Sequence, residues 1–129
     1  TWDDELAEIA QRWAIQCKFG HDKCRNVDSR WSWIGQNGAK AYGKITYPMD
    51  DLVQMWYDEV KDFDRNKVEK YEFDYNIGHY SQVVWAKTTK VGCGLIKYKE
   101  SNDWISIWLV CNYGPSGNYR DEKVYEIKK

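Results

Sequence analysis

The interpretation of this chain starts from the stretch Gly78-His79-Tyr80-Ser81-Gln82-Val83-Val84-Trp85-Ala86-Lys87-Thr88. It contains one of the two histidines of the sequence, next to a glycine and ahead of a short apolar and aromatic run. A run this short has no resolvable period, so residues 80–86 are consistent with a strand or with a short helical turn. The chemistry of His79 therefore has to be inferred from its neighbours in the fold.

Upstream of this stretch, residues 50–63 have the pattern of an amphipathic helix. Five apolar side chains follow the spacing of a buried stripe: Leu52, Met55, Trp56, Val60 and Phe63. Glu59 falls inside that stripe. Burying a carboxylate is costly unless a hydrogen bond or an opposite charge compensates it. The sequence therefore predicts that Glu59 pairs with His79.

Composition limits the classes of protein to which the chain can belong. Its 129 residues are enough for one domain with a core. Nineteen basic and twenty acidic residues leave a net charge of −1, which argues against nucleic acid as a partner. No apolar run approaches the ~20 residues that span a membrane. The four cysteines have no C-x-x-C spacing, which favours disulfides and a secreted, extracellular protein.

The remaining elements follow from capping and periodicity. A first helix is predicted from Thr1, with acids in its first turn, to Gly20. Its buried face comprises the residues at helical spacing: Leu6, Ile9, Ala10, Trp13, Ala14 and Cys17. Residues 22–47 are predicted to be a structured loop with one short strand, before a second helix capped by Asp50 or Asp51. Residues 64–77 are predicted to be an exposed loop, and the alternation of Tyr71, Phe73 and Tyr75 suggests an edge strand.

The last third of the chain is predicted to contain a β-hairpin. Residues 91–98 and 104–112 are strand-like and flank a polar loop. An antiparallel hairpin centred on that loop pairs residues whose numbers sum to about 203 or 204. Cys93 and Cys111 sum to 204, so a disulfide between them is expected. Residues 111–119 are dense in turn formers and predict an ordered loop, whereas the polar tail 120–129 is expected to be partly loose.

Two histidines and a glutamate on an apolar face allow three chemistries. His21, His79 and a carboxylate can form a divalent metal site. A histidine–glutamate pair can act as a general base, although no serine or cysteine stands in a recognisable nucleophile context. The pair can also be purely structural, with its hydrogen bonds satisfied internally. From the residues alone the structural interpretation leads, because buried polar pairs are more common than active sites.

Two stretches resemble the signatures of a known family. Residues 78–85 followed by Thr88, and residues 111–119, are similar to the two signatures of the CAP superfamily (cysteine-rich secretory, antigen 5 and pathogenesis-related proteins). Residues 17–24, 55–61 and 124–129 resemble its insect antigen 5 branch. The resemblance implies a single CAP domain over residues 1–129. Its implied α+β fold is a three-layer α-β-α sandwich with a small, mostly antiparallel sheet.

The resemblance also implies a cleft formed by His21, Gln36, Glu59 and His79, with His21 and His79 able to hold zinc or another divalent cation. No cofactor is required. Relatives have Gly-Glu-Asn where this chain has Gly35-Gln36-Asn37, and a glutamine cannot act as an acid or base. A non-enzymatic protein is therefore expected, with a metal-assisted hydrolase using the same cleft as the alternative.

The implied protein is a secreted, monomeric venom or salivary allergen. Its expected partners are a host antibody and a small apolar ligand such as a lipid or sterol, a divalent cation or a host molecule, bound through the cleft. The resemblance further implies an N-terminal helix and additional cysteines ahead of Thr1, so the chain is expected to be a truncated fragment. Cys17 and Cys24 would pair with that segment; otherwise they pair with each other, stay free or bind another chain.

Overall fold

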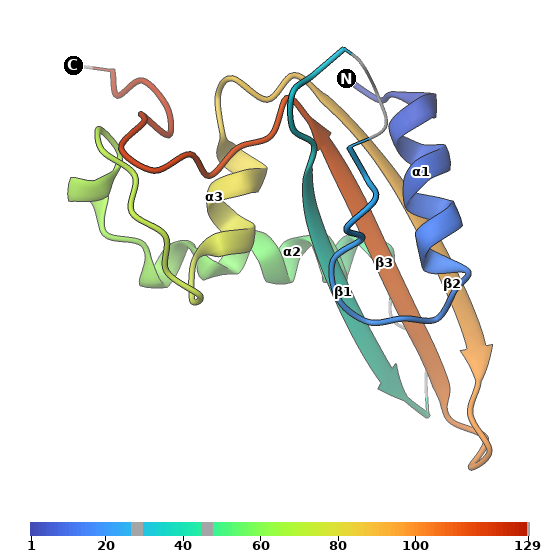
Figure 1. Ribbon diagram of the computed structural model, residues 1–129. Coiled ribbons are helices and arrows are strands. Elements are labelled where there is room, and N and C mark those ends of the chain that lie inside the picture. Colours follow the sequence, from blue (N-terminus) through green and yellow to red (C-terminus); the bar gives the residue numbers. More distant parts are fainter. Residues whose placement is uncertain (27–29, 45–47, 129) are drawn as a thin grey trace.

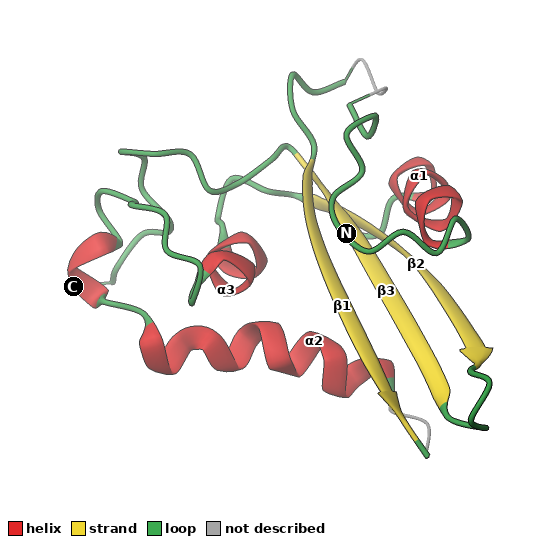
Figure 2. Cartoon of the chain, turned by 60° about the horizontal axis from the view of Figure 1, so that its bottom comes forward, coloured by secondary structure: helices red, strands yellow, loops and turns green. Residues whose placement is uncertain are grey.

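The computed structural model describes residues 1–26, 30–44 and 48–128 and shows three layers (Figures 1 and 2). Its helices and strands are α1 (Asp4–Ala14), β1 (Gly35–Gly43), α2 (Met49–Asp58), α3 (Gly78–Val84), β2 (Lys90–Lys99) and β3 (Ile105–Gly114), with short 3-10 helices at Glu59–Asp62 and Arg65–Lys67. Helix α1 covers one face of the sheet, and α2 and α3 lie on the other side (Figure 2). The predicted α-β-α sandwich is confirmed.

The sheet is built around the predicted hairpin. Its strand order is β1-β3-β2, and both pairings are antiparallel. The register places Cys93 opposite Cys111, and the two form the expected disulfide. Strand β1 spans nine residues, so the strand predicted within residues 22–47 is present but longer than expected. The parts of that loop at residues 27–29 and 45–47 lie outside the described chain.

Helix α1 is shorter than predicted at both ends. Asp3, and not Thr1, caps it by accepting a hydrogen bond from Leu6 N (2.9 Å). The Arg30 guanidinium donates to both Asp3 oxygens, and this bonding lowers the pKa of Asp3 from 3.8 to about 2. The helix ends at Ala14, and Cys17 follows in a positive-φ turn (φ 56°), where it is exposed. The expectation that Cys17 is on the buried face was therefore wrong.

The backbone of α1 packs directly on β2. A Cβ atom at Gly92 would lie 2.2 Å from Ala7 N, and one at Gly94 would lie 2.4 Å from Gln11 Cα. Only glycine permits an approach this close. The Gln11 side chain also accepts from Leu95 N (2.7 Å) and donates to Leu95 O (3.1 Å), so α1 pairs with the outer edge of the sheet as well.

Helix α2 covers the opposite face only in part. It begins at Met49 without a side-chain cap and ends at Asp58, so the predicted aspartate cap and the continuation to residue 63 were wrong. Leu52 and Trp56 are buried against the sheet. Met55 and Val60, predicted for the same stripe, are 57% and 39% exposed, and Val60 lies in the 3-10 turn that follows α2.

The segment before α3 and the tail pack on each other. Residues 64–77 contain no strand, and Tyr71 is fully buried while Phe73 and Tyr75 are exposed. Tyr71 N donates to Glu122 O (2.8 Å), and Val124 N donates to Val68 O (2.8 Å). Since Val124 is fully buried, the described part of the tail is anchored and not loose as expected.

Candidate functional site

A polar cavity of about 160 Å³ opens at the start of β1, where the two helical layers meet. Residues from five segments line it: His21, Gln36, Asn37, Phe73, Tyr75, Gly78, His79 and Asn118. Neighbouring strand residues point to opposite faces of a sheet. Gln36 accordingly bonds to Asn112 toward the α1 layer, and Asn37 bonds to the His79 carbonyl in the α3 layer. The cavity therefore receives one histidine from each layer.

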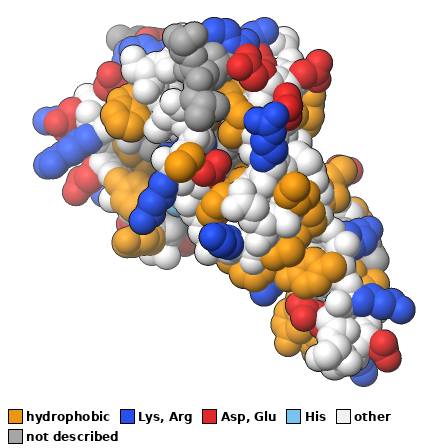
Figure 3. All heavy atoms as spheres, turned by 45° about the vertical axis from the view of Figure 1, so that its right-hand side comes forward, with side chains coloured by type: hydrophobic (Ala, Val, Ile, Leu, Met, Phe, Trp, Pro, Cys, Tyr) orange, Lys and Arg blue, Asp and Glu red, His pale blue; other side chains and the backbone are white. Residues whose placement is uncertain are grey.

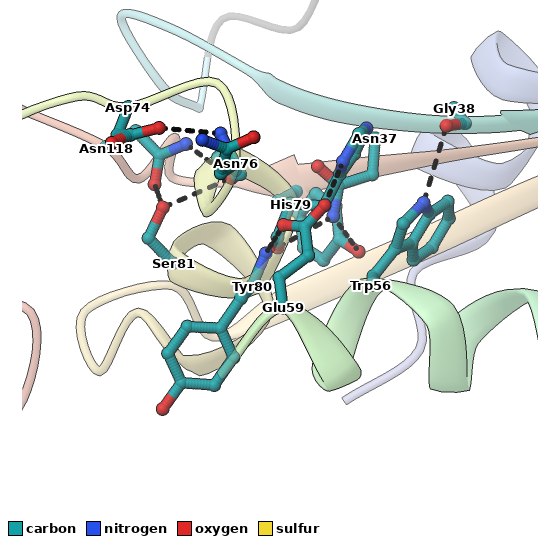
Figure 4. Close-up of polar contacts among 12 residues, drawn as sticks. Asn37, Gly38, Trp56, Glu59, Asp74, Asn76, His79, Tyr80, Ser81 and Asn118 are labelled. Atoms are coloured by element: carbon teal, nitrogen blue, oxygen red, sulfur yellow. Dashed lines mark hydrogen bonds and ion pairs between the residues drawn. The ribbon is translucent and has the colours of Figure 1, made fainter. Parts of the chain in front are cut away.

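His79 occupies the first turn of α3, which resolves the ambiguity between strand and helix. Its Nδ1 lies 2.8 Å from Glu59 Oε2, and Glu59 Oε1 accepts from Tyr80 N at 2.8 Å (Figure 4). The ring also stacks on Trp56, with centroids 6.0 Å apart and planes 13° apart. The predicted contact between Glu59 and His79 is thus present. The glutamate also caps the start of α3.

His21 is also held through Nδ1 by a side-chain oxygen, in this case on the α1 side of the sheet. Its Nδ1 lies 3.1 Å from Gln36 Oε1, which also accepts from Asp22 N (2.9 Å). Gln36 Nε2 donates to Asn112 Oδ1 (2.8 Å), and this fixes the orientation of the amide. Carboxylate and amide oxygens only accept hydrogen bonds, so Nδ1 carries the proton in both imidazoles. Among the described residues, Nε2 of neither ring has a hydrogen-bond partner.

The two sequence signatures are bonded to each other beneath this cavity. Ser81 donates to Asn118 Oδ1 (2.7 Å), and Asn118 donates to Gly78 O (2.9 Å) (Figure 4). Gly117 N donates to Gln82 Oε1 (2.9 Å). Tyr71 OH is 2.9 Å from Ser81 Oγ, and burial raises the pKa of Tyr71.

These bonds fix the start of α3 and thereby the position of His79. Sequence reasoning did not identify Asn118 or Tyr71 as part of the site. Asn118 lies in the second signature, residues 111–119, and this is the sequence signal that points to it; its positive φ (61°) is seen only in the structure.

The donor set does not make a zinc centre. Zinc sites in proteins use three or four protein ligands. Here the two histidines are the available donors, because both Glu59 oxygens and the Gln36 oxygen are engaged in hydrogen bonds. No group of three or more His, Cys, Asp or Glu side chains that could hold a metal occurs in residues 1–26, 30–44 and 48–128.

A second and larger hollow lies on the α2 face of the sheet. This groove, of about 780 Å³, has α2 as one wall and the sheet as its floor. Met49, Val53 and Tyr57 on α2 are 52%, 41% and 47% exposed along it, and Cys93 and Leu95 of β2 are half-buried in its floor. The groove shares no lining residue with the polar cavity. Sequence reasoning did not predict it.

The surface carries features that bear on partners. Hydrophobic side chains gather above the tip of the β2–β3 hairpin, among scattered charges of both signs (Figure 3). Cys17 and Cys24 are exposed free thiols in this structure, so the expectation that they pair with another segment stays a prediction. Within the described residues, no helix has the length and apolar character needed to cross a bilayer.

Comparison with known proteins confirms the resemblance predicted from the two signatures. The family model "Cysteine-rich secretory protein family" matches residues 1–113. Venom allergen 3 of Solenopsis invicta is 53% identical, over all of this chain and 57% of the ant protein. Venom allergen 5.02 of Dolichovespula maculata is 50% identical, over 99% of this chain and 60% of the relative. The chain thus spans less than two thirds of the length of these relatives.

Solved structures agree with the fold. BmVAL-1 superposes with a TM-score of 0.82 at 26% identity, over 100% of this chain and 65% of that protein. NaASP2, whose structure was solved with Zn2+, superposes with a TM-score of 0.76 at 25% identity, over 100% of this chain and 66% of that protein.

Proposed function

This chain belongs to the cysteine-rich secretory protein family, the CAP family, and we propose that it is a secreted, non-enzymatic venom or salivary allergen of the antigen 5 type that binds a small apolar molecule. The names of its relatives, venom allergens 3 and 5, support the allergen role and host antibodies as partners. The proposed binding site is the groove on the α2 face of the sheet, and the protein acts as a monomer.

The observation that carries this proposal is the size and lining of the groove. At about 780 Å³ it falls in the range of ~300–1,000 Å³ typical of small-molecule sites. Aliphatic, aromatic and sulfur-containing side chains form most of its wall. The polar cavity, at about 160 Å³, is too small for a lipid or sterol. The ligand site expected at the histidines is therefore assigned to the groove for apolar molecules.

A neutral fluorescent probe, N-phenyl-1-naphthylamine, tests this assignment. Helix α2 offers a matched pair of methionines: Met49 lines the groove and Met55 does not, yet they are 52% and 57% exposed. We expect the probe to bind the 129-residue chain with increased emission. Met49→Ser should weaken binding about tenfold, and Met55→Ser should leave it unchanged. Equal effects of the two substitutions, or no binding to the unsubstituted chain, would contradict the proposal.

A second candidate function is weak binding of a divalent cation by His21 and His79. The observation in its favour is that both rings have Nδ1 held by an acceptor and both line one cavity. The NaASP2 structure with Zn2+ belongs to a protein of the same fold. Zinc titration by calorimetry should give a dissociation constant that His79→Gln weakens at least tenfold. An unchanged constant would leave the histidines with a structural role.

We propose no hydrolase activity. Gln36 stands where an ionisable acid would be needed, and Glu59 is committed to His79 and Tyr80. Turnover of ester or peptide substrates by zinc-loaded Gln36→Glu protein, above that of His79→Gln in the same background, would favour the alternative of a metal-assisted hydrolase.

A further inference from the structure

We propose that Arg25 is a positioning residue of the polar cavity, and that it holds the imidazole of His21 in the tautomer with the proton on Nδ1. The proposal rests on the second candidate function, in which both histidines of the cavity contact a ligand, and it adds the residue on which the position of one of them depends. His21 is exposed and lies outside the helices and strands of the described chain. Contacts within its own irregular segment therefore have to hold it at the cavity.

The two histidines are held to different extents. His79 lies in α3, its ring stacks on Trp56, and both oxygens of Glu59 bond to the first turn of that helix. The ring of His21 has one hydrogen bond within the described chain, between Nδ1 and Gln36 Oε1 (3.1 Å). An exposed ring with one bond loses rotational freedom only if the backbone beside it is fixed, since ordering a side chain costs entropy.

Arg25 fixes this backbone. Its Nε donates to Ile34 O (2.7 Å), and its Nη1 donates to Asp22 O (2.9 Å). Asp22 directly follows His21, and Ile34 lies two residues before Gln36. One guanidinium thus joins the two backbone segments whose side chains form the bond between ring and amide. A guanidinium holds its donors in fixed directions, whereas the donors of a lysine ammonium rotate.

The same two segments are joined by further bonds. Gln36 Oε1 accepts from Asp22 N (2.9 Å) in addition to facing the His21 ring. Asn26, next to Arg25 in the chain, accepts from Ile34 N (2.7 Å) through its side-chain oxygen. The bonds of residues 25 and 26 therefore engage both backbone groups of the residue that leads into β1.

A charged side chain is a costly way to make these contacts. Arg25 is half-buried, and desolvation lowers its pKa, while the charge of Asp22 acts in the opposite direction. Among the described residues, its hydrogen bonds go to backbone carbonyls and not to a carboxylate. A buried cation without a bonded counter-charge lowers stability unless its bonds compensate. A purely structural role for Arg25 would stabilise the segment and leave the tautomer of His21 unchanged, so the test has to observe the ring itself.

Imidazole nitrogen NMR of the 129-residue chain tests the proposal, at about pH 8 and without metal, where an ordinary imidazole is neutral. Both histidines of the unsubstituted chain should show the proton on Nδ1. Arg25→Gln should convert His21 to a mixture of the two tautomers and leave His79 unchanged. Arg25→Lys, which keeps the charge, should give a smaller change at His21. Arg12→Gln removes an exposed positive charge from α1 and should change neither ring.

An unchanged His21 tautomer in Arg25→Gln, with or without a loss of stability to urea, would overturn the proposal. Equal changes at both histidines would also overturn it, because the substitution would then act on the whole fold. If Arg25→Gln does not fold, Arg25→Lys decides by the same readout, and an unchanged His21 in that variant has the same meaning.

Zinc titration by calorimetry separates this proposal from the function on which it rests. If the unsubstituted chain binds no zinc, the second candidate function fails, and the tautomer of His21 still decides the role of Arg25. If the chain binds zinc, Arg25→Gln should weaken binding about tenfold, as expected for a residue that orients a ligand side chain. An unchanged zinc affinity in that variant would contradict a role of Arg25 in the site.

Discussion

The two faces of the sheet are covered in different ways, although each carries helices. On the α1 face the backbone of the helix touches Gly92 and Gly94, and Ala10, Ala14 and Val110 are fully buried. On the opposite face α2 buries Leu52 and Trp56, while the floor beside β2 borders a groove of about 780 Å³. Glycine lets α1 lie close on β2, whereas the α2 face beside β2 borders the groove.

This contrast separates stability from binding. A closely packed face has no room for an added atom, so substitutions there lower the free energy of unfolding. A face with an open groove tolerates changes of side-chain volume, and substitutions there change the affinity for a ligand. Four predictions test this division, beginning with the one of largest expected effect.

Adding one carbon to each face gives the largest contrast. Gly94→Ala would place a Cβ 2.4 Å from Gln11 Cα and N, so α1 has to move, and we expect a loss of about 3 kcal/mol in the free energy of unfolding. Val53→Leu adds one carbon in the groove and should change that free energy by less than about 0.5 kcal/mol. Urea denaturation followed by circular dichroism measures both. Equal losses would mean that the faces are packed alike.

The anchor of α1 predicts a specific pH dependence. The folded-state pKa of Asp3 is about 2, below its ordinary value of 3.8. A lowered carboxyl pKa adds stability that is fully present above about pH 4 and is lost as pH falls through 2, on the order of 2 kcal/mol. We expect Asp3→Asn to lose this amount at pH 6 and to approach the unsubstituted protein near pH 2. Denaturation curves at both pH values give the difference, and parallel curves would contradict it.

Gln11 joins α1 to the backbone of β2, and its replacement should have an intermediate effect on the free energy of unfolding. Gln11→Leu keeps the size of the side chain but removes both bonds to the Leu95 backbone, at a cost of about 1 kcal/mol. Hydrogen exchange of the Leu95 amide should accelerate at least tenfold. If the exchange rate does not change, another group protects this edge of the sheet.

The smallest effect on stability is expected in the groove wall. Met49 is 52% exposed, so Met49→Ser should change the free energy of unfolding by no more than about 0.5 kcal/mol. The same substitution should weaken binding of the apolar probe, as described above. A large loss of stability would show that the groove wall belongs to the core and would undo the division between the two faces.

Local patterns identified the parts of the fold that depend on near neighbours. The hairpin register, and with it the disulfide between Cys93 and Cys111, followed from strand patterns on both sides of one polar loop. The contact of Glu59 with His79 followed from the cost of a carboxylate in an apolar stripe. The strand expected within residues 22–47 was predicted too short because the sequence of β1, GQNGAKAYG, is rich in glycine and alanine and has little of the β-branched character of a strand.

The sequence alone determined the family, through its two signatures, and the residues that carry the chemistry of the polar cavity. The resemblance already implied one cleft for His21 and His79, and only the tertiary structure decided that they enter it from opposite layers, because that depends on β1 running between them. The groove likewise could not be predicted. Its lining comes from side chains of α1, α2, α3, β2 and β3 that are far apart in the chain, and no local pattern specifies how they pack.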